Sequence, residues 1–142
     1  MKILYKTSVT SVGGRDNGQA DSEDGLLHVK LNKPVELGGA AGQTGTNPEQ
    51  LFGAGYSACF LSAMQLVAQQ NHQAFPADAK VTAQVKLGAV GAGFALEVEL
   101  HIILPGMDKA TAQAIAETAH TAVCPYSNAI RNNVDVKLVI EA

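Results

Sequence analysis

The sequence predicts an α+β fold in which antiparallel strands are covered by helices. Segments of alternating polar and apolar residues, typical of half-buried strands, are interrupted by two longer segments with helical periodicity. Their order is strand, strand, helix, strand, strand, helix, strand. Hydrophobic residues make up 46% of the chain and charged residues 16%, which is a balance typical of globular domains. No repeat or linker divides the chain, so we expect a single domain over residues 1–142.

The N-terminal part is expected to contain two strands joined by a turn. Residues 2–12 alternate polar and apolar side chains, and residues 25–32 place three apolar side chains on one face. The segment "GGRDNG" at 13–18 contains the Gly, Asp and Asn residues that turns favour. The glycine-rich segment 34–48 lacks the Gly-Lys-Ser/Thr ending of a phosphate-binding loop, which favours a plain connecting loop.

A helix is expected from residue 48 to about residue 70. Asn47 or Thr46 can cap it, and Pro48 suits its first turn. Glu49 lies where the positive end of the helix dipole favours a carboxylate. Apolar residues cover most of the circumference of this helix, more than one small sheet requires. We therefore expect a dimer that buries the helix further.

The C-terminal part is expected to contain a hairpin, a second helix and a closing strand: strands over 80–88, 94–104 and 134–141, and a helix over 109–123. Asp108 is in place to cap this second helix, and Pro125 is expected to start a further short helical turn.

Charge and hydropathy exclude several classes of protein. The formal net charge is −3, and no basic stripe is present, so a nucleic-acid partner is not expected. No run approaches the about 18 uninterrupted apolar residues of a membrane span, and the N-terminus lacks the apolar core of a signal peptide. We expect a cytoplasmic protein without a membrane partner. In that compartment a pair of cysteines is more often catalytic or metal-binding than a structural disulfide.

The chain has only two cysteines, and each lies among apolar residues. Cys59 is in the middle of "GYSACFLSAM", and Cys124 is in "AVCPYSNAIR". Free cysteine packs like a small hydrophobic residue, so two inert core thiols are one interpretation. The other interpretation is that the two thiols meet in space and carry out redox chemistry.

Other residues allow alternatives that the sequence does not favour. His120 and Cys124 lie four apart on one helix face, but zinc needs at least three protein ligands and no third one accompanies them. His120 also suits a base that activates the thiol, as in cysteine hydrolases, but no feature specifies an oxyanion hole. Taken singly, Arg15 is explained as a solvated turn residue and Glu49 as a carboxylate in a first helical turn.

Four longer segments carry more information: "GGRDNG", "ELGGAAGQTGTNPEQLFGAGYSACF", "LPGMD" and "AHTAVCPYSNAIRNN". They occur in this order over nearly the whole chain and resemble the organic hydroperoxide resistance branch of the Ohr/OsmC family. The resemblance implies an OsmC-like fold, in which antiparallel sheets wrap around buried central helices in an intertwined homodimer. It also implies that the active sites lie at the subunit interface.

The resemblance further implies a thiol-dependent peroxidase that reduces organic hydroperoxides, including fatty-acid hydroperoxides, to alcohols. Cys59 matches the cysteine that attacks the peroxide, and Cys124 matches the resolving cysteine that forms a disulfide with it. Arg15 matches the arginine that stabilises the reactive thiolate, and Glu49 matches its carboxylate partner. The implied reductant is a dithiol, such as a lipoylated protein, and no metal or flavin cofactor is expected. The alternative is a non-enzymatic, stress-related ligand-binding module of the same fold.

The spacing of two of these residues raises a geometric problem. Glu49 and Cys59 lie ten residues apart in one expected helix, which is roughly 15 Å along its axis. Either the helix breaks at a glycine between them, or the carboxylate comes from another subunit. We expect a composite site, with Cys59 and Cys124 from one chain and Arg15 and Glu49 from the other.

Overall fold

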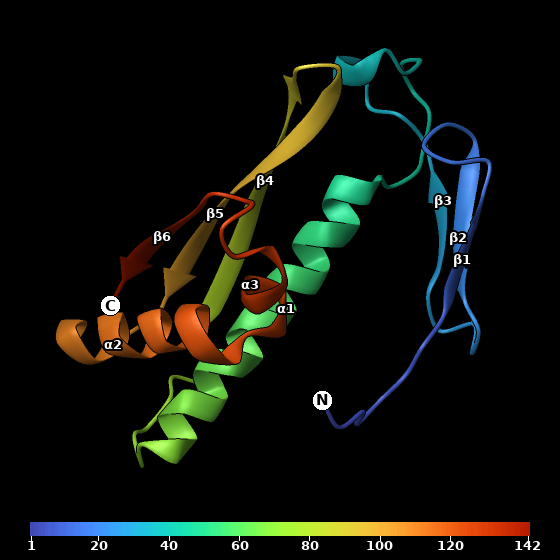
Figure 1. Ribbon diagram of the computed structural model, residues 1–142. Helices are drawn as coiled ribbons and strands as arrows, with labels where there is room; N and C mark the ends of the chain where they lie inside the picture. Colours follow the sequence, from blue (N-terminus) through green and yellow to red (C-terminus); the bar gives the residue numbers. More distant parts are fainter. The chain divides into compact units, whose positions relative to one another are not determined.

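The computed structural model describes residues 1–142 and divides them into two compact units, Met1–Leu51 and Phe52–Ala142 (Figure 1). The boundary falls within the first turn of helix α1 (Pro48–Gln70). Buried side chains in the first unit are few: Ala20, Leu31 and Asn32. So small a buried set does not make an independent core. A single domain over residues 1–142 stays a prediction.

The first unit contains a three-stranded antiparallel sheet, formed in chain order by β1 (Val9–Val12), β2 (Gly18–Ser22) and β3 (His28–Leu31). A 3₁₀ turn, Val35–Leu37, follows β3 in the glycine-rich loop. The two expected strands are present but shorter than predicted. No strand includes residues 2–8, which are exposed throughout.

The middle strand, β2, was not predicted from the sequence. Its residues are "GQADS", and Ala20 is the only apolar one, so the strand has too weak an alternation to be recognised. Small residues are required here because the backbone packs closely. A side chain at Gly18 would collide with the carbonyl oxygen of Gly14 in the preceding turn. Tertiary pairing with both neighbours therefore creates this strand in spite of its composition.

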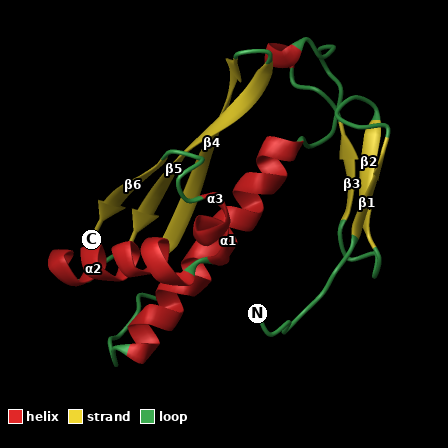
Figure 2. Cartoon of the chain, viewed as in Figure 1, coloured by secondary structure: helices red, strands yellow, loops and turns green.

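The second unit is a three-stranded sheet with helices packed on one face (Figure 2). Its strands are β4 (Lys80–Val90), β5 (Gly93–Ile103) and β6 (Val136–Glu141), and β4 and β5 form the predicted antiparallel hairpin. Alternate residues of β5 are buried against α1 and α2 (Lys109–Thr118) in one hydrophobic cluster. The fully buried large side chains of this cluster are Tyr56, Phe60, Met64, Val67, Val98, Leu100, Ile102, Leu104 and Ile115.

The antiparallel arrangement expected for every strand is wrong for β6, which pairs with β5 in parallel. The reason is the connection between them. After β5 the chain passes through α2, a π-helical turn (Ala119–Val123) and α3 (Pro125–Ile130) before it returns. A crossover of this length brings the next strand back in the same direction. The expected helix over 109–123 is also divided, because its last five residues form the π turn.

Helix α1 has the predicted bounds, and its local sequence explains its start. The side chain of Asn47 accepts a hydrogen bond from the Gln50 N–H at 2.9 Å, which is the predicted cap. Along the helix only one side is buried in the single chain, and Leu66 is 43% exposed. By length and composition α1 would also suffice to span a membrane, a test that core helices of globular proteins pass as well. The dimer that would cover its exposed side stays a prediction.

Candidate active site

Both cysteines belong to the second unit and to its hydrophobic cluster. Cys59 lies on α1 and is partly exposed, whereas Cys124 precedes α3 and is fully buried. Both are free thiols. Although they are far apart in sequence, both thiols lie in this one cluster, and Cys124 contributes to the raised pKa of Cys59. The fold thus brings together the two thiols that the redox interpretation requires.

The surroundings of Cys59 make its thiolate unfavourable. Burial raises the pKa of the Cys59 thiol, and the neighbouring Cys124 thiol raises it further. A hydrogen bond from the backbone N–H of Tyr126 acts in the opposite direction and lowers this pKa. All of these groups belong to Phe52–Ala142. Within this unit, then, Cys59 is held as a thiol at neutral pH.

The backbone around Cys124 is held on both sides. Its N–H donates to the carbonyl oxygen of Ala119, five residues earlier, at 2.8 Å, which closes the π turn. Its own carbonyl oxygen accepts from the N–H of Asn128 at 2.9 Å, so that Cys124 is the N-cap residue of α3. Pro125 occupies the first helical position, where no N–H is needed. Single π turns inside helices occur frequently at functional sites.

A buried hydroxyl group that connects the elements carrying the cysteines was missed by the sequence analysis. Ser127 Oγ lies 2.7 Å from the hydroxyl of Tyr56 and 2.9 Å from Nδ1 of His120. Burial is the larger cause that lowers the pKa of His120, and the positive charge of Arg131 is the smaller one. This histidine is therefore neutral at pH 7. The sequence carries no signal for this bridge, because its three residues come from three separate elements. His120 was considered only as a metal ligand or as a base.

Tyr126 packs closely on α1 at a glycine. Its ring stacks on that of Tyr56, with centroids 5.8 Å apart, and meets Phe52 edge to face at 6.1 Å. A Cβ atom at Gly55 would lie 2.9 Å from Cζ of Tyr126 and even closer to its hydroxyl oxygen. Gly55 is therefore the position that allows the first turn of α3 to approach α1.

Alanine substitutions at two neighbouring glycines test this contact. Gly53→Ala is expected to stabilise the protein by up to about 1 kcal/mol, because alanine favours the helix and its Cβ would meet Val85 at an ordinary 3.5 Å. Gly55→Ala should lose this gain, because Tyr126 must leave its place on Tyr56. Thermal unfolding of both variants measures the difference. Equal increases in Tm would show that the Tyr126 contact does not contribute to the folded state.

Arg15 and Glu49 form a two-point ion pair in the first unit. Nη1 and Nη2 of Arg15 donate to the two carboxylate oxygens of Glu49 at 2.8 and 2.7 Å. Hydrogen bonding from this guanidinium holds the pKa of Glu49 below its usual value, against an opposing effect of partial burial. The Arg15 side chain is 42% exposed and that of Glu49 16%, so the guanidinium keeps donor groups free for another partner.

One buried amide holds together the segments that carry this pair. Asn32, at the end of β3, accepts a hydrogen bond from the N–H of Asn17 at 3.3 Å and donates to the carbonyl oxygen of Thr44. It thus connects the turn that carries Arg15 to the loop that leads into α1. The sequence analysis missed Asn32, because a lone polar residue at a strand end carries no distinctive signal.

The four predicted residues therefore form two pairs, Cys59 with Cys124 and Arg15 with Glu49. Helix α1 is continuous from Pro48 to Gln70, so the alternative of a helix break between Glu49 and Cys59 is wrong. The alternative in which two subunits contribute to one site stays a prediction.

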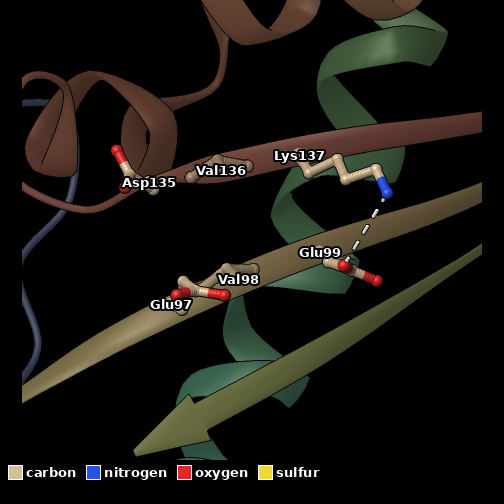
Figure 3. A pocket seen from close by; sticks show the side chains of 6 residues that line it. All are labelled: Glu97, Val98, Glu99, Asp135, Val136 and Lys137. Carbon is tan, nitrogen blue, oxygen red and sulfur yellow. Dashed lines mark ion pairs between the residues drawn. The ribbon is translucent and has the colours of Figure 1, made fainter. Parts of the chain in front are cut away.

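A shallow hollow of about 280 Å³ lies elsewhere on the second unit, over β5 and β6 (Figure 3). Glu97 and Glu99 line it and alternate along β5 with the buried Val98, so they lie on the sheet face opposite α1. Lys137 Nζ lies 4.0 Å from Glu99, and no group of three His, Cys, Asp or Glu side chains with metal-binding geometry is present in the protein. The hollow does not include the cysteines.

Comparison with known proteins agrees with this fold. The family model described as OsmC-like protein matches residues 38–139. The organic hydroperoxide resistance protein of Xanthomonas axonopodis pv. citri is 50% identical over 139 residues, covering 98% of this chain and 96% of the relative. Crystal structures of organic hydroperoxide resistance proteins are also similar. The structure from Legionella pneumophila is 47% identical, with a TM-score of 0.92, and the match covers 99% of this chain and 100% of the Legionella chain. The structure from Elizabethkingia anophelis is 46% identical, with a TM-score of 0.91, and the match covers 99% of each chain. This chain therefore belongs to the OsmC-like family, in its organic hydroperoxide resistance branch.

Proposed function

We propose that this protein is a cysteine-based peroxidase that reduces organic hydroperoxides, including fatty-acid hydroperoxides, to alcohols. The observation that carries the proposal is that one hydrophobic cluster contains both a partly exposed thiol, Cys59, and a buried one, Cys124. The similar proteins are named for organic hydroperoxide resistance, which supports a role in peroxide detoxification. In this reaction the hydroperoxide is both the substrate and the oxidant, and the two thiols of the chain supply the two electrons that reduce it.

In the first step the Cys59 thiolate attacks the distal oxygen of the hydroperoxide. A sulfur–oxygen bond forms and the peroxide O–O bond breaks. The alkoxide leaves and takes up a proton to become the alcohol, while Cys59 is oxidised to a sulfenic acid.

In the second step the sulfur of Cys124 attacks the sulfenic sulfur of Cys59. A disulfide forms, the sulfur–oxygen bond breaks, and the hydroxyl leaves as water with the proton of the Cys124 thiol. A dithiol reductant, such as a lipoylated protein, then reopens the disulfide through a mixed disulfide. No metal or flavin takes part in this sequence, and we expect it to operate in the cytoplasm.

Arg15 carries a positive charge, which none of the groups that act on the pKa of Cys59 in the second unit provides. Since burial and Cys124 raise the pKa of Cys59, a nearby positive charge is needed to favour the thiolate. The two-point pair with Glu49 holds the guanidinium in one orientation and leaves other N–H groups to face sulfur or peroxide oxygen. We place this pair in the site of the partner subunit of a homodimer, which would also cover the exposed side of α1.

A thiol titration tests the proposed function. Reduced protein should lose both free thiols after one equivalent of an alkyl hydroperoxide, because one peroxide oxidises two thiols to one disulfide. Incubation without peroxide is the control. A stress-related ligand-binding module would retain both thiols, and this outcome would contradict the proposal.

A further inference from the structure

The second step of the proposed reaction depends on how closely the two sulfur atoms are held. Cys59 lies in the middle of α1, and Cys124 lies at the junction between the π turn and α3. No disulfide joins Cys59 to Cys124 in the reduced protein. Their separation is set by the contacts between α1, the π turn and α3.

The hydroxyl group of Ser127 lies where these three elements meet. Its oxygen is 2.7 Å from the Tyr56 hydroxyl on α1 and 2.9 Å from His120 Nδ1 in the π turn. Ser127 and Tyr56 are both fully buried, so neither hydroxyl can exchange its partner for water without a local opening of the structure. A serine hydroxyl offers one donor and two acceptor positions, so it can form a hydrogen bond with each of these two neighbours.

The position of this bridge relative to the two cysteines is nearly symmetric along the chain. Tyr56 lies three residues before Cys59 on α1, and Ser127 lies three residues after Cys124 on α3. Each is thus about one helical turn from a reacting sulfur. A shift at Ser127 would therefore change the approach of one thiol to the other.

We propose that Ser127 is a positioning residue that holds α3 against α1, so that Cys124 can resolve the sulfenic acid on Cys59 before a second peroxide oxidises it. This inference rests on the proposed peroxidase function. Ser127 acts on the second step, in which the disulfide forms and water leaves. The first step uses Cys59, the peroxide and the guanidinium that favours the thiolate, and this bridge forms no hydrogen bond with any of them.

The sulfenic acid on Cys59 can react with Cys124 or with a second peroxide, and the ratio of the two products measures the rate of disulfide formation. Disulfide formation has a rate that is independent of peroxide, whereas further oxidation to sulfinic acid becomes faster as peroxide increases. The fraction of Cys59 that becomes sulfinic acid at several peroxide concentrations, determined by mass spectrometry, therefore reports the rate of resolution. Rapid quenching with a thiol-blocking reagent reports the first step separately.

Ser127→Ala is expected to slow disulfide formation about tenfold or more, because small displacements of reacting groups have large effects on rate. The first step should change less than about threefold on the same argument. Tyr56→Phe removes only the other hydroxyl of the bridge and should have a similar effect. The double variant should be no slower than Ser127→Ala, because Ser127→Ala already removes the hydrogen bond to Tyr56.

Thr121→Ala is the matched control. It removes an exposed hydroxyl from the same π turn, where Thr121 donates at 2.8 Å to the carbonyl oxygen of Glu117. Its rate of resolution should equal that of the wild type. If Ser127→Ala does not fold, Tyr56→Phe alone decides the test.

Two negative results have different meanings. If wild-type protein loses no thiol on addition of peroxide, the proposed function is wrong, and the inference is wrong with it. If wild type, Ser127→Ala and Tyr56→Phe all lose both thiols and accumulate sulfinic acid equally, the peroxidase remains and the positioning role of Ser127 is overturned.

Discussion

Replacement of Cys59 by serine is expected to reduce peroxidase activity to the uncatalysed background. A serine hydroxyl has nearly the same shape, but it is scarcely ionised at neutral pH and far less nucleophilic than a thiolate. Cys124 cannot replace Cys59, because it is fully buried, whereas Cys59 is partly exposed to an approaching substrate. Consumption of an alkyl hydroperoxide with a dithiol reductant measures this loss.

Cys124→Ser serves as the matched variant, because it removes the other thiol and leaves the first step intact. One equivalent of peroxide should be consumed, with a sulfenic acid on Cys59 that further peroxide oxidises irreversibly. Mass spectrometry of each variant after peroxide distinguishes the two roles. Retained activity in Cys59→Ser, with sulfinic acid on Cys124, would reverse the assignment of the two cysteines.

Mixed dimers of two inactive variants are expected to recover about half of the wild-type activity per mixed dimer, if each site combines two chains. In a dimer of Cys59→Ser with Arg15→Ala, one site would lack both groups. The other site would contain the intact Cys59 of one chain and the intact Arg15 of its partner. If Cys59 and Arg15 acted within one chain, neither site would be complete.

The experiment consists of unfolding both variants, refolding them together in equal amounts and measuring peroxide consumption. Each variant refolded alone gives the baseline. A mixture of Cys59→Ser with Cys124→Ser is a matched control, because both cysteines belong to the same chain in the proposed site. That mixture should remain inactive in repeated turnover. Activity in the control but not in the Arg15 mixture would contradict the proposed division of the site.

The elements that could be predicted from the sequence are those that depend on local interactions. The bounds of α1 follow from Asn47, Pro48 and a long apolar pattern, and its cap is the predicted one. Asp108 caps α2 as predicted, through the N–H of Thr111 at 3.0 Å. The hairpin of β4 and β5 follows from alternation on both sides of a glycine-containing turn. Capping, helical periodicity and strand alternation involve residues that are neighbours in the chain, so these elements could be predicted without a tertiary structure.

Part of the candidate site was also available from the sequence. The motifs around Cys59 and Cys124 indicated the family, and with it Arg15 and Glu49 as a pair. The structure contains that pair as a two-point hydrogen-bonded contact. The two thiols come together on separate elements, and no local pattern in the sequence relates them.

Features that depend on residues far apart in the chain could not be predicted and are seen only in the folded protein. The strand β2 exists because two neighbours pair with it, and β6 is parallel because a helical crossover precedes it. The raised pKa of Cys59 results from burial and from a thiol that lies far along the chain. The bridge through Ser127 requires α1, the π turn and α3 to meet at one atom. Sequence patterns report the period of a single element, whereas these features depend on which elements pack together and which groups they exclude from water.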